Sequence, residues 1–219
     1  MTVGSGGRTG LVLAAGFGSR LAEGRASGSL KPLTRVAGKP LIQRTLDSLS
    51  RARCEKAVIV LGFRAGHLEE EIRSAYAGPL HLSFVYNPHF DKKNGLSVLA
   101  AQPFVSGEFV LVMADHVLGG TLMDLAAEHQ PPTGGASLLV DRKIDTIFDM
   151  DDATKVRTEG EKIVAIGKDL TDFDCIDTGV FVCTQGLFEA LEQVRQDSGD
   201  ASLSEGVSKL AAAGKMTVL

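Results

Sequence analysis

Residues 11–21 read LVLAAGFGSRL, an apolar run that passes directly into a loop of small residues with two glycines. An uninterrupted apolar run is typical of a strand buried on both faces. Small residues let backbone N–H groups approach a polyphosphate, and glycine tolerates the backbone angles that such a loop needs. Arg20 can make forked hydrogen bonds to phosphate oxygens, and Lys31, in a Lys-Pro-Leu sequence, supplies a further positive charge. These residues predict a phosphate loop at the end of a buried strand.

The loop matches neither of two common phosphate-binding motifs. Position 21 is Leu, which excludes G-x-G-x-x-G, and no Gly-Lys-Ser/Thr follows, which excludes a P-loop. By itself, a Gly-x-Gly after a strand also fits a glycine-rich turn with Arg20 and Lys31 on the surface, so this alternative stays open.

Outward from the loop, short apolar runs alternate with amphipathic segments. We expect strands at residues 9–14, 56–61, 82–86, 108–113 and 136–140, and helices at 41–51, 65–75 and 120–130. After the PPTGG sequence at 131–135 we expect a hairpin of 155–158 with 162–166, a strand at 177–183, and helices at 186–196 and 204–213. The alternation predicts an α/β fold of three α-β-α layers, with a Rossmann-like, mostly parallel sheet and a small antiparallel subregion.

The same pattern predicts one domain over residues 9–219 after a flexible tail at 1–8. Its first half, about 9–135, carries the phosphate loop, and its second half is about 136–219. Net charge is −4, which argues against a nucleic-acid partner or a membrane surface, and the longest apolar runs fall far short of the ~20 residues that span a bilayer. Three cysteines without a CxxC spacing fit a reducing cytoplasm.

A candidate metal ligand follows the expected strand at 108–113. Asp115 comes two residues after the end of this strand, and ligands of open α/β sheets gather at the carboxyl ends of strands. A carboxylate there suits Mg²⁺, which keeps waters and bridges to substrate phosphates. The alternative is a turn residue that caps the next helix. The neighbouring His116 could orient Asp115, touch a ribose or simply pack.

Further candidates stand on the same side of the expected sheet. Asn87 follows the strand at 82–86, and Asn94 and Gly95, close to Ser97, stand at a helix start that offers donors to an anion or a base edge. For Asn94, a type I′ turn with a helix cap is the alternative.

The string LAAGFGSRL with the later KPL resembles the nucleotidyltransferases that carry an LxAGxGxRL…KP signature and transfer a nucleotidyl group from an NTP to a phosphorylated acceptor. The Ala-Ala form is more similar to cytidylyltransferase branches than to the Gly-Gly form of sugar-1-phosphate enzymes. The resemblance implies catalytic roles for Lys31 and Arg20 and a Mg²⁺ ion on Asp115. It implies nucleotide binding by Leu13, Ala14, Ala15, Gly16, Gly18, Ser19, Asn87, Asn94, Gly95 and Ser97.

The second half is similar to the branch that uses CTP and inositol-1-phosphate to form CDP-inositol. The strings that carry this resemblance are DATKV at 152–156, IGKDL at 166–170 and FDCIDTG at 173–179. Cations would hold the acceptor phosphate, and carboxylates would accept hydrogen bonds from ring hydroxyls. The implied acceptor residues are Asp141, Arg142, Lys155, Lys168, Asp169, Asp177 and Thr178. The alternative is that these charges decorate a solvated hairpin.

Two departures and several alternatives remain. Relatives often carry a second metal-binding Asp in a late segment resembling WxDVDT, whereas this chain stops at Leu219 in an apparent strand start, so either its end is truncated or it differs. Some relatives are fused to a membrane CDP-alcohol transferase, which we expect only as a downstream partner. Other readings are a sugar-1-phosphate enzyme, a phosphocholine enzyme, the guanylyltransferase of molybdenum-cofactor synthesis, or a nucleotide-binding module without catalysis. Phosphocholine needs an aromatic cage, and the chain has no Trp and two Tyr.

Overall fold

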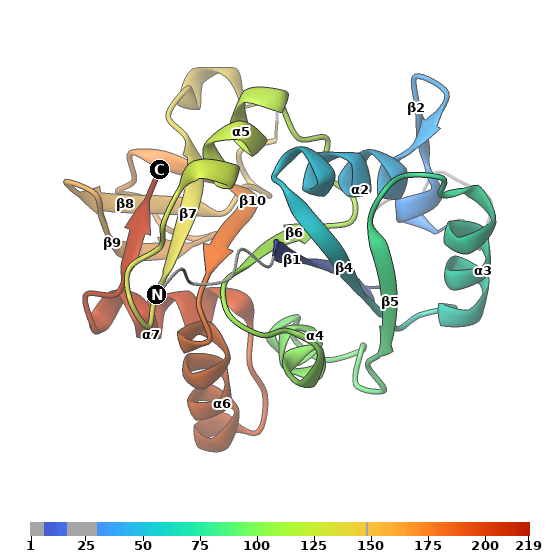
Figure 1. Cartoon of the computed structure of the whole chain (residues 1–219). Helices are drawn as coiled ribbons and strands as arrows, with labels where there is room; N and C mark the ends of the chain where they lie inside the picture. Colours follow the sequence, from blue (N-terminus) through green and yellow to red (C-terminus); the bar gives the residue numbers. More distant parts are fainter. Residues whose placement is uncertain (1–6, 17–29, 148) are drawn as a thin grey trace, which may run out of the picture.

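A twisted nine-stranded sheet runs through the part of the chain that the computed structural model describes, residues 7–16, 30–147 and 149–219 (Figure 1). Its strand order is β5-β4-β1-β6-β10-β7-β11-β9-β8. The strands are β1 (Arg8–Ala14), β4 (Cys54–Leu61), β5 (His81–Tyr86), β6 (Phe109–Met113), β7 (Ala136–Asp141), β8 (Lys155–Glu159), β9 (Lys162–Gly167), β10 (Cys175–Cys183) and β11 (Met216–Val218).

The first half of the sheet is parallel. Strand β1 lies between β4 and β6, so that Leu11 is opposite Val58 on one side and Leu111 on the other. Strand β10 then runs antiparallel to both β6 and β7. Strand β8 pairs with β9 and also with the start of β10, so β7, β11, β9, β8 and β10 form a closed circuit. The expected antiparallel subregion is therefore present.

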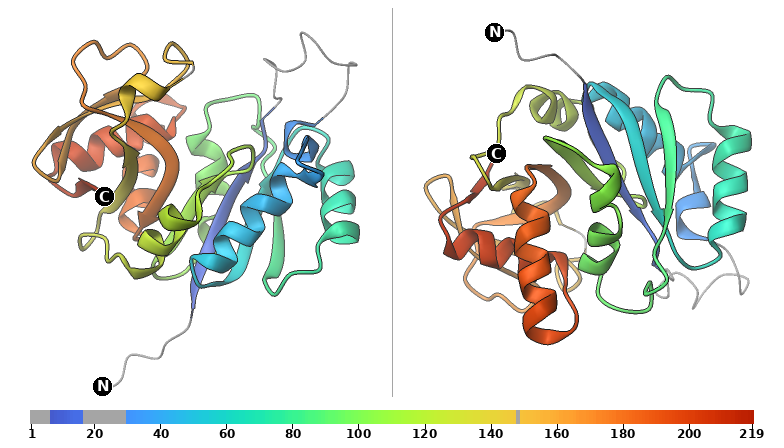
Figure 2. Two further views of the ribbon diagram at one scale, coloured as in Figure 1. Left: turned by 90° about the horizontal axis from the view of Figure 1, so that it is seen from above. Right: turned by 60° about the horizontal axis from the view of Figure 1, so that its bottom comes forward.

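Helices cover both faces of the sheet. Helices α2 (Leu41–Arg51), α3 (Ala65–Ala75) and α5 (Gly120–Glu128) pack on one face, and α4 (Gly95–Ala100), α6 (Gly186–Ser198) and α7 (Leu203–Ala212) pack on the other. Figure 2, right, shows green α4 beside orange α6. Successive residues of β1 alternate between the two cores, because side chains of a strand point to opposite faces: Leu11 joins the α4 side and Val12 the α2 side. The three-layer prediction is confirmed.

Local sequence signals account for several helices. Helix α2 buries Leu41, Ile42, Thr45, Leu46 and Leu49, the face that the 3.6-residue period predicts. Helix α7 begins at a capping box in which Ser202 and Glu205 exchange hydrogen bonds. In α5, Met123 and Ala126 are the buried residues, and Leu125 is exposed.

The expected tail extends one residue too far. Arg8 belongs to β1, where it pairs with Cys54 of β4. Its guanidinium donates to the carbonyl oxygens of Ala126 (2.8 Å) and His129 (2.5 Å) and pairs with Glu108 (2.8 Å). Long-range partners of this kind leave no local trace in the sequence. The short elements also went unpredicted: β2 (Arg35–Val36), β3 (Lys39–Pro40) and the 3₁₀ turns η1 (Lys31–Leu33), η2 (Gln102–Phe104) and η3 (Ile144–Thr146).

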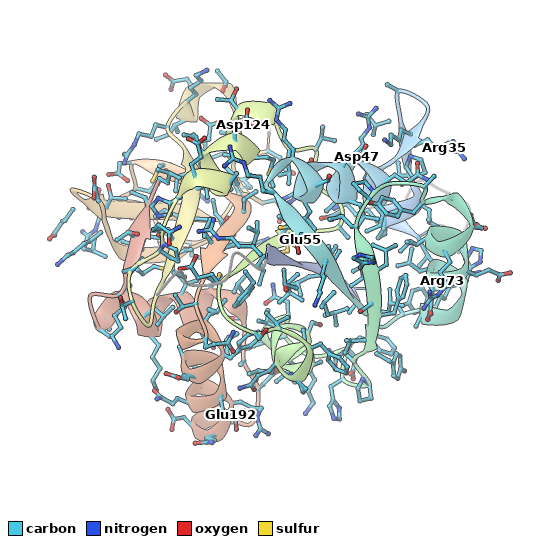
Figure 3. All side chains as sticks on the ribbon, viewed as in Figure 1. Arg35, Asp47, Glu55, Arg73, Asp124 and Glu192 are labelled. Atoms are coloured by element: carbon cyan, nitrogen blue, oxygen red, sulfur yellow. The ribbon has the colours of Figure 1, made fainter. Side chains whose placement is uncertain are left out.

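Charged side chains lie on the outer faces of the helices. Figure 3 marks Asp47 on α2, Arg73 on α3 and Asp124 on α5, all of them exposed. Within the described ranges, no helix has both the length and the apolar composition to cross a bilayer.

Candidate active site

A cavity of about 190 Å³ opens where the parallel strands β1 and β6 end. The two strand ends are joined by a hydrogen bond from Ala114 N to the carbonyl oxygen of Leu13 (3.1 Å). Gly16, Lys31 and Asp115, which the sequence places in three separate segments, meet in this cavity. Its lining consists of Leu13, Ala14, Ala15, Gly16, Lys31, Pro32, Asn94, Ser97, Met113, Ala114 and Asp115.

The loop after β1 is anchored on one side and open on the other. The carbonyl oxygen of Ala15 accepts a hydrogen bond from Phe63 N (3.1 Å), and a Cβ at Gly62 would lie 2.6 Å from that oxygen. Gly16 is exposed, and none of the described residues would lie within 4 Å of a Cβ placed there. The backbone at Gly16 is therefore accessible to a ligand. Gly18, Ser19 and Arg20 lie outside the described residues.

Lys31 and Asp115 form an ion pair within the cavity. Lys31 begins η1, and the buried Pro32 beside it anchors that turn. Their side chains are 36% and 26% exposed, respectively, so both remain accessible to a bound ligand. This pair combines a point charge suited to phosphate with a hard oxygen ligand.

Helix α4 forms the opposite wall. Ser97 lines the cavity, and its hydroxyl accepts a hydrogen bond from Asn87 Nδ2 (3.0 Å). Asn87 itself is buried and does not line the cavity, so it contacts the site through Ser97. Asn94 also lines the cavity, while its Oδ1 accepts from Leu203 N (2.9 Å) on α7. Its right-handed backbone (φ −67°) excludes the type I′ turn. Gly95 lets α4 pack closely, because a Cβ there would lie 2.5 Å from the carbonyl oxygen of Ala201.

Two further hollows adjoin the cavity on the side of the second half. One, of about 550 Å³, shares Asp115 with it and is lined by Asp141 and Thr178 against an apolar wall of Val117, Leu118 and Leu122. The other, of about 230 Å³, shares Asn94 and Met113 with it and is lined by Asp152, Thr154 and Asp177. His116 lines both hollows. Three of the expected acceptor residues, Asp141, Asp177 and Thr178, thus line the two hollows beside the cavity.

The expected acceptor cations are placed differently. Arg142 lies 3.8 Å from the Asp174 carboxylate, and Lys155 Nζ donates to the carbonyl oxygen of Lys168 (2.5 Å). Lys168 Nζ pairs with Asp152 (2.5 Å), which itself lines the smaller hollow. Among the described residues that line these two hollows, none is one of the three cations, so each would have to reorient before it contacts an acceptor phosphate there. Asp169 is exposed in the turn after β9.

Asp177 carries the most perturbed carboxyl of the acceptor side. Desolvation raises its pKa to about 6, against the lowering effects of a hydrogen bond from Gly179 N (2.6 Å) and of nearby His116. Sequence reasoning left His116 undecided and gave Asp152 no role. His116 could have been found only as the neighbour of Asp115, and Asp152 only as the first residue of the DATKV string.

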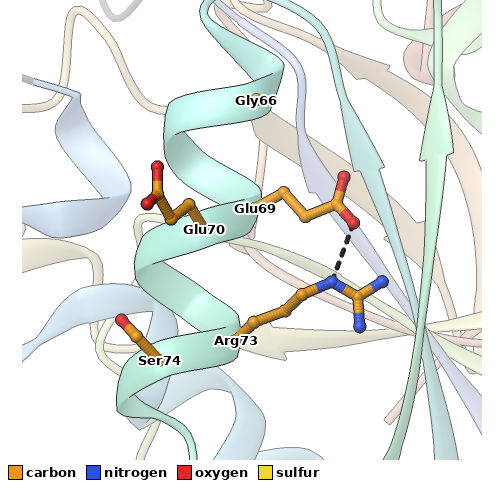
Figure 4. A pocket seen from close by; sticks show the side chains of 5 residues that line it. All are labelled: Gly66, Glu69, Glu70, Arg73 and Ser74. Carbon is orange, nitrogen blue, oxygen red and sulfur yellow. Dashed lines mark hydrogen bonds and ion pairs between the residues drawn. The ribbon is translucent and has the colours of Figure 1, made fainter.

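A separate hollow of about 500 Å³ lies along α3, lined by Gly66, Glu69, Glu70, Arg73 and Ser74 (Figure 4). Glu69 and Arg73 are paired across one helical turn (2.8 Å). None of the residues singled out in the sequence reaches it.

The family model for the MobA-like NTP transferase domain matches residues 10–212. The chain belongs to this family. A bifunctional IPC transferase and DIPP synthase from Rubrobacter xylanophilus is 37% identical over 201 residues, covering 88% of this chain and 42% of the relative. The protein of the same name from Thermococcus kodakarensis is 35% identical over 196 residues, covering 89% and 42%. The chain thus spans about two fifths of the length of these relatives.

Solved structures confirm the nucleotidyltransferase fold. The inositol-1-phosphate CTP transferase from T. maritima superposes with a TM-score of 0.83 at 27% identity, covering 97% of this chain and 84% of that one. A putative glucose-1-phosphate thymidylyltransferase from Bacillus anthracis gives 0.82 at 16% identity, with coverage of 97% and 86%, which shows the fold alone.

MobA-like NTP transferases and their relatives generally use a divalent metal ion. Among the described residues, no group of three or more His, Cys, Asp or Glu side chains could enclose a metal. A single carboxylate still fits Mg²⁺, which is usually held by one or two carboxylates together with substrate phosphates and water. Asp115, half-buried at the end of a strand and facing the cavity, has this character.

Proposed function

We propose that the chain is a cytidylyltransferase that converts CTP and inositol-1-phosphate to CDP-inositol and pyrophosphate. The observation that carries this proposal is the cavity shared by Gly16, Lys31 and Asp115, with polar hollows beside it for a second substrate. The names of the Rubrobacter and Thermococcus relatives and of the T. maritima structure support the choice of substrates.

The substrates would lie side by side across the ends of β1 and β6. The CTP phosphates would contact the loop after β1, including Arg20 and Ser19, and the nucleoside would lie toward Asn94 and Ser97. The acceptor would occupy the hollows lined by Asp141, Asp177 and Thr178. Residues 9–135 would then supply most of the NTP site and residues 136–219 most of the acceptor site, within one domain.

In the reaction, an oxygen of the acceptor phosphate attacks the α-phosphorus of CTP in line, and the bond to the β-phosphate oxygen breaks. The attacking oxygen is already ionised, so the protein needs no general base. Its task is positioning and charge neutralisation. Lys31 would turn from Asp115 to the α-phosphate and stabilise the charge that accumulates there. Mg²⁺ on Asp115, when bound, would neutralise further phosphate charge and orient the leaving pyrophosphate.

A panel of CTP, UTP, GTP and ATP against several phosphorylated acceptors, with Mg²⁺, tests the proposal through pyrophosphate release. We expect release with CTP and inositol-1-phosphate, little release with the other NTPs or with phosphocholine, and none with EDTA. Release only with a different pair would replace the substrate assignment. CTP binding without release from any pair would indicate a nucleotide-binding module.

We further propose a cytoplasmic location and a second enzyme that consumes CDP-inositol. The three cysteines are free and buried, which suits a reducing compartment. The relatives' names pair an IPC transferase with a DIPP synthase, which motivates the second enzyme; we expect a membrane CDP-alcohol transferase.

A further inference from the structure

A β-bulge interrupts β10 beside the acceptor hollows. The pairing of β10 with β7 shifts register between Asp177 and Val180, so Thr178 and Gly179 leave the ladder. Gly179 adopts a left-handed backbone (φ +79°), and its N–H donates to Asp177 Oδ1 (2.6 Å). Bulges next to active sites commonly redirect a backbone or side-chain group. Here the redirected group is the carbonyl of Thr178.

The bulge holds the ring of His116 in one orientation. His116 Nδ1 lies 3.2 Å from the carbonyl oxygen of Thr178, and Thr178 is itself fixed because its hydroxyl donates to the carbonyl oxygen of Leu139 (2.6 Å). A Cβ at Gly179 would lie 2.4 Å from Nδ1 and 2.6 Å from Cε1 of the ring. Only glycine leaves room for the imidazole at this distance, in addition to permitting the left-handed backbone.

The contact with Thr178 decides which ring nitrogen carries the hydrogen. A carbonyl oxygen can only accept, so Nδ1 must donate, and in a neutral imidazole Nε2 then keeps a lone pair. Nε2 lies 3.9 Å from Asp115 Oδ1, beyond hydrogen-bond distance, and no residue in the described ranges donates to it. The His116 side chain is 43% exposed and borders both acceptor hollows. An oriented hydrogen-bond acceptor therefore faces the space where the second substrate would lie.

We propose that His116 is a specificity-determining residue whose Nε2 accepts a hydrogen bond from a ring hydroxyl of the polyol phosphate acceptor. This inference rests on the proposed function. The flanking carboxylates of Asp141 and Asp177 are also acceptors, so the hollows present several acceptors to a ligand rich in hydroxyl donors. A ligand without a hydroxyl at this position leaves Nε2 unpaired and binds more weakly.

The substitution His116→Asn distinguishes the roles of the two ring nitrogens. The Asn amide nitrogen can replace Nδ1 as donor to Thr178, but nothing replaces Nε2. We expect the KM for inositol-1-phosphate to rise about tenfold, the effect of one lost hydrogen bond, with the KM for CTP unchanged. His116→Gln, whose amide oxygen reaches farther toward the Nε2 position, should recover part of the loss. His67→Asn, on the exposed face of α3, is the matched control and should change neither KM.

A set of acceptor analogues, each lacking one ring hydroxyl, identifies which hydroxyl donates to His116 Nε2. With the wild-type protein, one of these analogues should have a kcat/KM about tenfold below that of inositol-1-phosphate. With His116→Asn, the same analogue and inositol-1-phosphate should have equal kcat/KM values. Equal losses in both proteins for every analogue would overturn the assignment. An equal rise of both KM values in His116→Asn would also overturn it, because a general distortion of the site produces that result.

The hydrogen position can be read without turnover. In ¹⁵N imidazole spectra of the neutral ring, with the His116 signals assigned by their loss in His116→Asn, we expect the hydrogen on Nδ1. The opposite tautomer would overturn the proposal. A wild-type protein that uses no polyol phosphate would refute the proposed function, whereas normal turnover with no acceptor-specific effect of His116→Asn would refute this inference alone.

Discussion

Lys31 Nζ and Asp115 Oδ2 form an ion pair across the cavity at the ends of β1 and β6. The proposed reaction needs these two charges in different places: Lys31 at the α-phosphate and Asp115 at the metal ion. Because both side chains are partly exposed, the pair contributes about 1 kcal/mol or less, and substrates can replace it readily. When substrates bind, Lys31 would exchange Asp115 for the α-phosphate, and Asp115 would exchange Lys31 for the divalent metal ion.

Lys31→Gln should lower kcat/KM for pyrophosphate release by roughly 10²–10³-fold, because one preorganised charge on the transition state is lost. The fold should be retained, since Lys31 is part-exposed and only Pro32 of η1 is buried. Steady-state kinetics and thermal unfolding measure the two effects. Lys39→Gln removes the exposed partner of Asp47 on α2 and serves as the control. Near wild-type kinetics in Lys31→Gln would remove its assigned role.

The same substitution should strengthen metal binding when nucleotide is absent. Without Lys31, Asp115 loses its lysine partner among the described residues. Mn²⁺ affinity measured by electron paramagnetic resonance should therefore increase about two- to fivefold, the contribution of a partly exposed ion pair. Unchanged or weaker Mn²⁺ binding would show that the pair does not compete with the metal.

Asp115→Asn should abolish metal-dependent turnover, because a neutral amide is a much weaker ligand for a hard divalent cation. Pyrophosphate release titrated with Mg²⁺ measures this effect. Asp124→Asn, which removes the surface partner of Arg51, is the matched control and should titrate like wild type. An Asp115→Asn variant with the wild-type Mg²⁺ dependence would place the metal elsewhere.

Asn87→Ala should lower the free energy of unfolding by about 1–3 kcal/mol, because it removes a buried amide and leaves the Ser97 hydroxyl and His89 N–H without their partners. The KM for CTP should rise at the same time, since Ser97 lines the nucleotide cavity. Urea unfolding and CTP kinetics measure these effects. Loss of stability with an unchanged KM would make Asn87 purely structural.

Asp177→Asn should stabilise the protein near neutral pH. The pKa of Asp177 is raised from 3.8 to about 6, so ionisation weakens the folded state as the pH rises through this interval, and the full penalty is present above it. At about 1.4 kcal/mol per unit, the penalty is at most about 3 kcal/mol. Asn can still accept the Gly179 N–H. The gain in thermal midpoint should therefore be larger at pH 7.5 than at pH 4.5, and a gain independent of pH would contradict this account.

The sequence predicted what depends on local pattern and missed what depends on distant pairing. The apolar face of α2 and the placement of Asp115 follow from periodicity and from the rule that ligands gather at the ends of strands. The sequence alone places Arg8 in the tail, because the partners of its side chain stand a hundred or more residues away. The role of His116 stays open in the sequence for a similar reason, because its orientation comes from a bulge 62 residues farther along the chain.

The acceptor cations illustrate the same limit. The resemblance implies that Lys155 and Lys168 hold the acceptor phosphate, and this role stays a prediction. In the structure, the hairpin geometry engages these lysines with the Lys168 carbonyl and Asp152. Such pairing is set by the register of β8 against β9, which residue types alone do not specify.

A crystal structure of the protein with CTP and Mg²⁺ tests the shared cavity most directly. We predict the α-phosphate within about 3 Å of Lys31 Nζ, as in a charge-assisted hydrogen bond, with the metal on Asp115 and the Lys31–Asp115 pair broken. A nucleotide bound outside the cavity of Gly16, Lys31 and Asp115, or inside it with that ion pair intact, would contradict the account.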